Sequence, residues 1–233
     1  MPSSVFDKID LSKGFDERLP IVPQVYEVLR RLILSLHLEP GMIVPKSEFA
    51  KRFAVSPMPI REALRRLEEE GLVVIKPQSG TYVAPIDIQS AWEAQFLRIA
   101  LEVEIVRKVA ETIDAQGVRT LQSILVHQTL EFETENKEGF VEDDAAFHRS
   151  MYEIADVNGL WRKVRVMRAH IDRLRMLHLP EPGKMESILG DHHAILDAVS
   201  AQDPSRAETA MRGHLSGTLV EIESFRNKYP QYF

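Results

Sequence analysis

The chain has 233 residues, of which 44% are hydrophobic and 27% charged, and it contains no cysteine. These proportions are typical of a globular protein, and the length suffices for two modest domains, each with a core. The lack of cysteine excludes disulfides, thiolate catalysis and sulfur-ligated zinc. No apolar run reaches the roughly 20 residues of a membrane-spanning helix, and the start of the sequence has no signal-peptide pattern, so we expect a cytoplasmic protein without membrane contact.

The net charge of −6 is unevenly distributed along the sequence. Residues 1–85 contain 12 Lys and Arg against 11 Asp and Glu, a balance of +1, whereas residues 86–233 contain 17 against 24, a balance of −7. Within residues 45–66, six basic residues accompany two acidic ones. Contact with phosphates requires such local positive charge. The N-terminal part is therefore the candidate for binding nucleic acid.

Residues 1–20 have mixed charge and no sustained periodicity, and we expect them to form a mobile arm. A helix begins near Pro23 and ends at Glu39-Pro40-Gly41. A second helix, a turn and a third helix then occupy residues 49–71. Ser56 is placed to cap the third helix. The side of this helix opposite the apolar stripe carries Met58, Arg61 and Arg65.

Two short β-forming runs, 73–75 and 81–83, flank Pro77-Gln78-Ser79-Gly80 and predict a hairpin. Helix, turn, helix and hairpin in this order predict a winged helix-turn-helix, which places its second helix in the major groove of double-stranded DNA. A single arginine-bearing helix would more often be a solvated surface, so the order of the elements carries the argument. Because one such helix reads few bases, we expect a homodimer on a palindromic operator.

The remainder of the chain has helical periodicity throughout. It predicts six helices joined by short loops, over residues 88–113, 118–136, 140–155, 160–179, 185–201 and 204–227. The expected fold is therefore mainly α: a winged helix over 21–85, and over 86–233 a six-helix antiparallel bundle for effector binding and dimerisation.

One carboxylate and three imidazoles fall in the apolar stripes of these helices. Asp144 and His148 are four residues apart on one helix, and His192 and His214 lie on two others. Nitrogen and oxygen ligands without sulfur suit a divalent ion: zinc first, with nickel or manganese as alternatives. Each residue alone is more commonly ion-paired or hydrogen-bonded, and periodicity only mildly prefers His192 to the adjacent His193.

The other histidines, His127, His170 and His178, have no expected ligand role, although His170 and Arg168 could line a cavity. A metalloenzyme using the Asp/His site is one alternative reading. We see no general base at the spacing of a helical His-Glu-x-x-His motif, and an enzyme would not need the winged helix. A dedicated metal-ion sensor is a second alternative.

Both parts of the chain contain short, distinctive motifs. Those of the N-terminal part are Glu39-Pro40-Gly41, Pro59-Ile60-Arg61-Glu62-Ala63-Leu64 and Gly80; those of the C-terminal part are Phe147-His148, residues 192–198 and residues 211–215. With them the chain resembles the GntR family of bacterial transcriptional regulators, FadR subfamily, with an FCD effector domain. A count of six C-terminal helices would favour the VanR-like subgroup.

The resemblance implies roles for individual residues. Arg61 would contact the operator, and Gly80 would form the wing tip that enters the minor groove. Metal ligands in FCD domains match Asp144, His148, His192 and His214, a match that selects His192 over His193. The metal in such domains helps to hold a small carboxylate effector, for which Arg98 is a candidate contact.

One departure from the family bears on DNA recognition. The family usually has Ser-Arg-Thr-Pro where this chain has Ser56-Pro57-Met58-Pro59. An arginine that contacts DNA is therefore absent at Pro57, and Lys46 is the candidate to compensate. We expect a transcriptional regulator, not an enzyme, whose operator binding responds to a small carboxylate.

Overall fold

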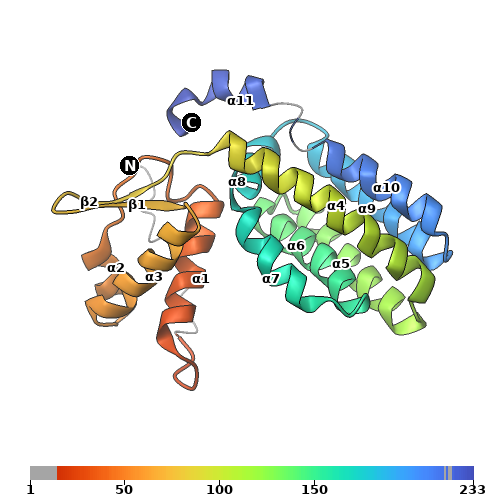
Figure 1. The fold of residues 1–233 in the computed structure, drawn as a ribbon, viewed down its shortest axis with the longest axis horizontal. Coiled ribbons are helices and arrows are strands. Elements are labelled where there is room, and N and C mark those ends of the chain that lie inside the picture. The colour runs from red at the N-terminus through yellow and green to blue at the C-terminus, as the bar shows by residue number, and fades with distance from the viewer. Residues whose placement is uncertain (1–14, 218, 220–221) are drawn as a thin grey trace. The chain divides into compact units, whose positions relative to one another are not determined.

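The computed structural model describes residues 15–217, 219 and 222–233 (Figure 1). The chain divides into two compact units, one containing the residues up to Ile88 together with Glu223–Phe233, the other containing Gln89–Ile222. Residues 1–14 of the expected arm lie outside the described residues. The sequence placed Glu223–Phe233 with the bundle, whereas the structure groups this segment with the first unit, where the Ile86 backbone N–H donates to the Tyr232 carbonyl at 2.7 Å.

The first unit combines three helices and a hairpin from the N-terminal part of the chain with a short C-terminal segment. Its elements are α1 (Ile21–Leu34), α2 (Lys46–Arg52), α3 (Pro57–Glu69), β1 (Val73–Lys76), β2 (Gly80–Val83) and, from the end of the chain, α11 (Ile222–Lys228) with a 3₁₀ turn at Pro230–Tyr232. The core of this unit is fully buried and is built from one face of each helix, including Leu29, Phe49, Ile60 and Leu64. The stripe at residues 60, 63, 64 and 67 thus faces inward, as its periodicity predicts.

A buried ion pair joins α1 to the end of α3. Arg30 Nε donates to Glu70 at 2.9 Å, and the Tyr26 hydroxyl donates to the other oxygen of the same carboxylate. Gly71 follows with a φ of +73°, a conformation that ends a helix readily only at glycine. This arrangement fixes the direction in which the chain enters the hairpin.

The hairpin is antiparallel, with Val73 opposite Val83 and Lys76 opposite Gly80. Its tip is the three-residue loop between those last two positions. Gly80 is the first residue of β2 and directly follows this loop, because the ladder extends one pair further than the sequence suggested. Its expected contact with the minor groove stays a prediction. Gly80 has a φ of +148°, and a Cβ at this position would meet Ile43 Cδ1 at 3.0 Å.

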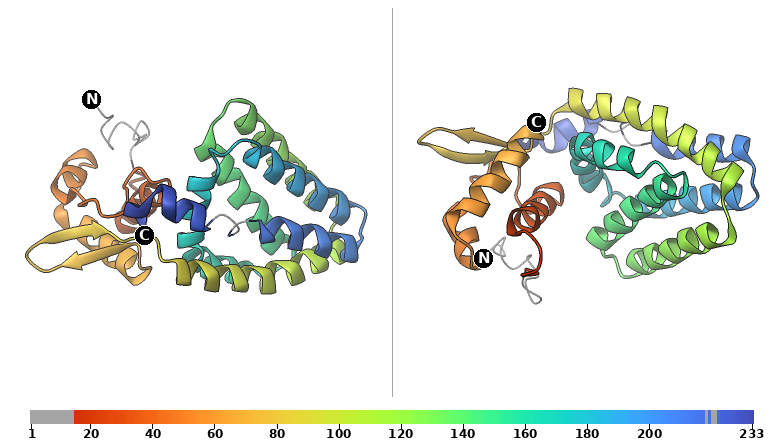
Figure 2. Two further views of the ribbon diagram at one scale, coloured as in Figure 1. Left: turned by 90° about the horizontal axis from the view of Figure 1, so that it is seen from above. Right: turned by 60° about the horizontal axis from the view of Figure 1, so that its bottom comes forward.

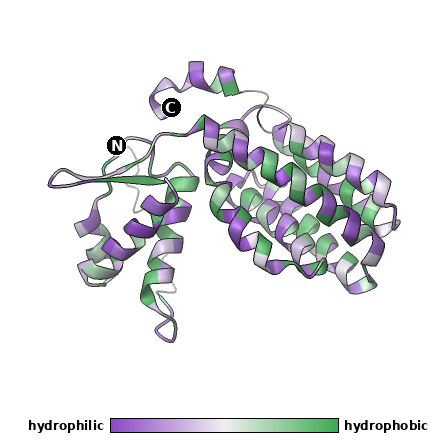
Figure 3. Cartoon of the chain, in the orientation of Figure 1, coloured by the Kyte–Doolittle hydropathy of each residue, from purple (hydrophilic) through white to green (hydrophobic). Residues whose placement is uncertain are grey.

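The second unit is entirely helical (Figures 1 and 2). Its helices are α4 (Ile88–Thr112), α5 (Ala115–Glu133), α6 (Lys137–Ile154), α7 (Asn158–Met167), α8 (Ala169–His178), α9 (Lys184–Ser200) and α10 (Pro204–Ser216). Asp114, Asn136 and Asp203 cap α5, α6 and α10 by accepting a backbone N–H of the first turn. Hydrophobic and hydrophilic segments alternate along the bundle helices (Figure 3), consistent with one buried face on each.

The predicted count of six bundle helices is wrong. The segment expected at 160–179 is interrupted at Arg168, which ends α7 and precedes α8, and the segment expected at 204–227 ends at Ser216 before α11 begins. Arg168 is buried and ion-paired to Asp172 at 2.9 Å, so its position is determined by buried charges that the apolar pattern does not show. The described residues of the second unit form seven helices, a count that does not support the VanR-like assignment.

None of the helices in the described part of the chain is long and apolar enough to cross a membrane.

Candidate metal centre and DNA-binding surface

Four side chains from three helices meet in the interior of the second unit. Asp144 and His148 project from α6, His192 from α9 and His214 from α10, and one ligand atom of each lies within 4.8 Å of the others. All four residues are buried. The i, i+4 spacing on α6 supplies two of them, and antiparallel packing of α9 and α10 brings in the other two.

The closest approach within the cluster is between two imidazole nitrogens. His148 Nε2 and His214 Nε2 are 3.1 Å apart, and Asp144 Oδ1 lies 3.5 Å from His192 Nε2 and 4.0 Å from His148 Nε2. His192 Nε2 is buried and has no hydrogen-bond partner in the described chain. Such an atom is rare in a protein interior and calls for an explanation.

The neighbouring polar groups determine which His192 nitrogen carries the proton. Gln128 Nε2 donates to the Phe140 carbonyl at 3.3 Å, which turns the Gln128 carbonyl oxygen toward His192 Nδ1, 2.8 Å away. An amide oxygen only accepts, so His192 Nδ1 carries the hydrogen and Nε2 presents a lone pair to the cluster.

The other two imidazoles follow the same pattern. His148 Nδ1 lies 2.6 Å from Glu102 Oε2, and His214 Nδ1 lies 3.4 Å from Asp191 Oδ2. Oxygen atoms behind the Nδ1 atoms orient both rings so that Nε2 points inward, the usual arrangement of metal-binding histidines. His148 Nε2 and His214 Nε2, 3.1 Å apart, can share one hydrogen; when both atoms carry lone pairs instead, a cation between them relieves their repulsion. The donor set therefore fits a divalent metal ion.

The ionisation states of His192, His214 and Asp144 are those that a metal ligand needs. Burial and the neighbouring His214 hold the pKa of His192 well below its ordinary value, and burial, opposed by Asp191, lowers the pKa of His214 to about 4. Burial also raises the pKa of the Asp144 carboxyl, but the ion pair with Arg175 outweighs this and holds the pKa well below its usual range. These rings are neutral and the carboxylate is charged at neutral pH, so no proton has to be removed from them.

The Asp144 carboxylate also belongs to a buried ion-pair network. Arg175 donates to both oxygens, at 2.7 Å for Oδ2, and Arg168 Nη2 lies 3.6 Å from Oδ2. Sequence reasoning missed Arg175, Glu102 and Gln128 in these roles. All three are polar residues in the register of an apolar helix stripe, which is the signal that could have identified them.

The remaining histidines lie outside the cluster. His193 is exposed, with its Nδ1 2.8 Å from the Leu189 carbonyl oxygen, whereas the adjacent His192 is buried. His127 is exposed and pairs with Asp143 at 2.6 Å. His170 is buried but is not among the residues that line the cavity described next, whereas His178 is.

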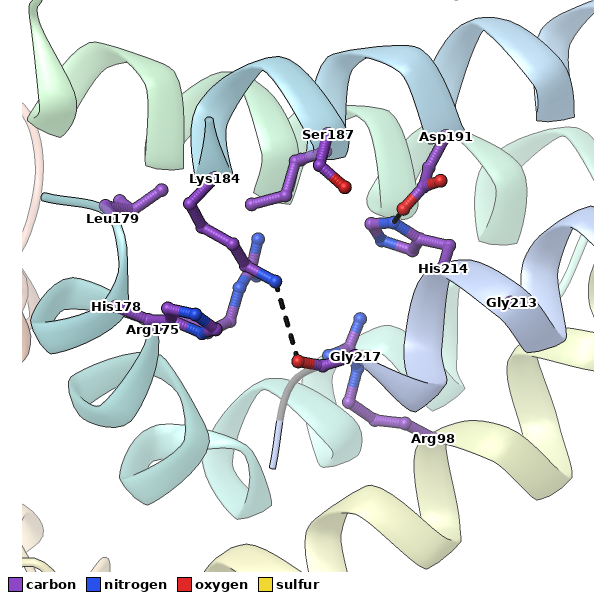
Figure 4. A pocket seen from close by; sticks show the side chains of 11 residues that line it. Arg98, Arg175, His178, Leu179, Lys184, Ser187, Asp191, Gly213, His214 and Gly217 are labelled. Carbon is purple, nitrogen blue, oxygen red and sulfur yellow. Dashed lines mark hydrogen bonds and ion pairs between the residues drawn. The ribbon is translucent and has the colours of Figure 1, made fainter. Parts of the chain in front are cut away.

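A cavity of about 270 Å³ adjoins the cluster (Figure 4). His214 belongs to both, and Arg98 lines the cavity while its Nη2 lies 3.5 Å from His148 Nε2. The rest of the lining includes Arg175, His178, Lys184, Ser187 and Asp191. Its cationic side chains suit an anion. Lys184 and Asp191 were not anticipated from the sequence.

The first unit presents an exposed surface on α2 and α3. The side chains of Lys46, Ser56, Met58, Arg61 and Arg65 are all exposed, with Met58 at 71%. Ser56 occupies the N-cap position of α3, although its side chain makes no capping hydrogen bond. The backbone of α3 thus starts where predicted, and the Ser56 hydroxyl is not committed to the cap.

The two candidate arginines on α3 differ in their partners. Arg65 pairs with Glu62 at 3.5 Å and Glu69 at 3.3 Å, whereas Arg61 has no ion pair or hydrogen bond with any residue in the described part of the chain. Exposed pairs such as these are weak. Of the two arginines, Arg61 is therefore the more available to bind a DNA base or phosphate.

Comparison with known families assigns both units. Residues 22–83 match the model described as bacterial regulatory proteins, gntR family, and residues 93–217, more than half of the chain, match the FCD domain. This chain belongs to the GntR family. The GntR-type winged helix and the FCD domain expected from the short motifs are thus confirmed.

Relatives of similar length support the assignment. The chain is 31% identical to the HTH-type transcriptional repressor RspR of Escherichia coli over 214 residues, which cover 92% of this chain and 94% of RspR. It is 34% identical to an HTH-type transcriptional regulator of Streptomyces ambofaciens over 209 residues, 90% and 88% of the two chains. The structure of E. coli McbR/YncC shares the fold, with a TM-score of 0.78 at 19% identity over 91% of this chain and 99% of that one. This GntR protein is a DNA-binding transcriptional regulator and not an enzyme.

Proposed function

We propose that this GntR regulator binds its operator as a homodimer and that a small carboxylate, held beside a metal ion in the FCD domain, controls that binding. The observation that carries the proposal is the convergence of three imidazoles and the Asp144 carboxylate, with a cationic cavity adjoining them.

Asp144, His148, His192 and His214 would hold the ion. Three imidazoles and one carboxylate without sulfur suit zinc first, with nickel or manganese as alternatives. When bound, the ion would supply a positively charged position for one effector carboxylate. Arg98 would donate to the same carboxylate, since it lines the cavity and approaches His148.

The DNA-binding face would be formed by α3 and the hairpin. Arg61 is the principal candidate for a base contact, with Arg65, Ser56 and Met58 beside it on the exposed side of α3. Lys46, the first residue of α2, would add a phosphate contact in place of the arginine that Pro57 replaces. Gly80 would contribute by adopting the positive φ that the backbone of the hairpin requires at this position.

Dimerisation is typical of the GntR family, and operator geometry gives it a physical reason. A two-fold dimer reads two half-sites about one helical turn apart, and effector binding changes affinity only if it favours one arrangement of the two DNA-binding units over another. A monocarboxylate or dicarboxylate with equal affinity for both arrangements would shift nothing.

The test combines metal analysis with operator binding. Wild-type protein should retain about one divalent ion per chain, and His192→Ala should lose both the ion and the response of operator binding to a carboxylate. His193→Ala is the matched control, because the neighbouring ring is exposed and should leave both unchanged.

Two results would overturn the proposal. Metal-free wild-type protein that still responds fully to a carboxylate would remove the ion from the mechanism. Operator binding that follows metal concentration and ignores every carboxylate would favour a dedicated metal sensor instead.

A further inference from the structure

The cavity beside the cluster has two chemically different ends (Figure 4). His214 and Asp191 lie at one end, and Lys184, His178 and Arg175 at the other. The α9 residues of the lining, at positions 184, 187, 188 and 191, form one stripe of that helix, so α9 spans the cavity from end to end.

The ion pairs that connect to the cluster are charge-balanced among themselves. Three carboxylates of this network each pair with an arginine, with hydrogen bonds of 2.7, 2.9 and 2.9 Å: Asp144–Arg175, Glu102–Arg98 and Asp172–Arg168. The cavity lining adds one cation, Lys184, and one anion, Asp191. Four positive and four negative side chains thus sum to zero.

A divalent ion would therefore bring two positive charges that no side chain offsets. Net charge in a buried site is costly unless it is paired. One carboxylate would leave a net charge of +1, and two would neutralise the site.

We propose that the effector is a small dicarboxylate, whose first carboxylate lies beside the metal cluster and Arg98 and whose second is received by Lys184 and Arg175. This rests on the proposed function. Lys184 enters the cavity from the first turn of α9, with Nζ 3.5 Å from the Gly217 carbonyl at the end of α10. A monocarboxylate would instead present its alkyl end to Lys184 and Arg175.

The cavity limits the size of the acid. Its volume of about 270 Å³ is at the lower limit of small-molecule sites, which span roughly 300–1,000 Å³. A chain of a few carbons between the two carboxylates fits this space.

The test compares succinate with butyrate, which have the same number of carbons and differ by one carboxylate. Calorimetry on metal-loaded, full-length protein should give at least about tenfold tighter binding of succinate, a difference of roughly 1.4 kcal/mol. Lys184→Met should weaken succinate about tenfold and butyrate less than about twofold, while Lys184→Arg retains the preference. Lys163→Met, at an exposed lysine of α7, should change neither affinity.

Equal affinities for succinate and butyrate would overturn this inference and leave the proposed function standing. A succinate preference that survives Lys184→Met would overturn the assignment of Lys184. If no acid in the series acetate, butyrate, malonate, succinate and glutarate bound the metal-loaded protein, both the inference and the proposed function would fail.

Discussion

Arg61 differs from its neighbours on α3 because no acidic side chain in the described chain holds it. Arg65 and Arg66 both contact Glu62, at 3.5 and 3.9 Å, so part of their charge is already compensated. An uncompensated guanidinium on the exposed side of a recognition helix can reach a guanine edge with both of its donor positions. This makes Arg61 the most informative single residue of the DNA-binding unit.

Arg61→Ala should weaken specific operator binding by about 1–3 kcal/mol, the usual value of one bidentate base contact. Affinity should be measured for operator and scrambled duplex at one salt concentration. Arg206→Ala, at an exposed arginine of α10, is the control and should leave both affinities unchanged. Equal losses on the two duplexes would instead indicate a phosphate contact.

At the scale of elements, the hairpin depends on a glycine. Gly80 adopts a φ of +148° next to Ile43, whose Cδ1 would lie 3.0 Å from an added Cβ. Gly80→Ala should therefore lower the free energy of local opening of the hairpin by about 1 kcal/mol or more, because the backbone conformation is unfavourable for alanine. Amide hydrogen exchange in residues 73–83 should become roughly fivefold faster or more.

Gly190→Ala is the matched control for that substitution. Gly190 is exposed within α9 and has open space around it, so alanine there should raise helix stability by up to about 1 kcal/mol. Unchanged exchange of the hairpin in Gly80→Ala would show that the strand accommodates a side chain at this position.

The surface between α5 and α6 offers a pH-dependent contact. His127 Nδ1 lies 2.6 Å from Asp143 Oδ2, and the hydrogen bond with this carboxylate raises the pKa of His127 above its ordinary value near 6.5. Because the folded pKa is raised, the pair stabilises the fold fully below the unfolded pKa, and this contribution is lost as pH rises through the folded pKa. NMR titration should show the raised pKa, and Asp143→Asn should bring it back toward 6.5. A wild-type pKa of 6.5 or lower would mean that the pair does not form in solution.

At the scale of the whole molecule, metal binding should stabilise the second unit selectively. An ion at about 100 times its dissociation constant adds about 2.7 kcal/mol to the stability of the unit that binds it. Both tryptophans, Trp92 and Trp161, lie in that unit, so the thermal transition seen by their fluorescence should shift downward on chelation. Hydrogen exchange of residues 21–83 should be unaffected.

His192→Ala supplies the control for chelation, since a protein that cannot hold the ion should not respond to a chelator. The same downward shift in this variant would mean that the chelator acts elsewhere.

The sequence predicted the parts of this molecule that depend on local periodicity. The inward stripe of α3, the hairpin and the shared register of Asp144 and His148 follow from repeats of 3.6 and 2 residues. The FCD and GntR assignments also followed, because their motifs are short and contiguous.

The parts that the sequence did not predict depend on contacts between distant segments. Arg175 and Gln128 are long polar side chains whose partners, Asp144 and His192, lie on other helices. The interruption between α7 and α8 coincides with Arg168, whose buried ion pairs with Asp144 and Asp172 also join different turns and helices. The place of Arg175 and Gln128 in an apolar stripe marks these side chains as buried, but no spacing within a single helix encodes their partners, which only the tertiary structure reveals.

The hydrogen bond from the Ile86 N–H to the Tyr232 carbonyl has a practical meaning for dissecting the protein. The polypeptide leaves the DNA-binding unit once after Ile88 and returns to it at Glu223, so no single cut separates the two units. A fragment ending at residue 88 would lose α11 and the acceptor for Ile86, and a tag fused to Phe233 would be attached to the DNA-binding unit. Excising that unit intact therefore requires two breaks, or a circular permutation that joins its two segments into one.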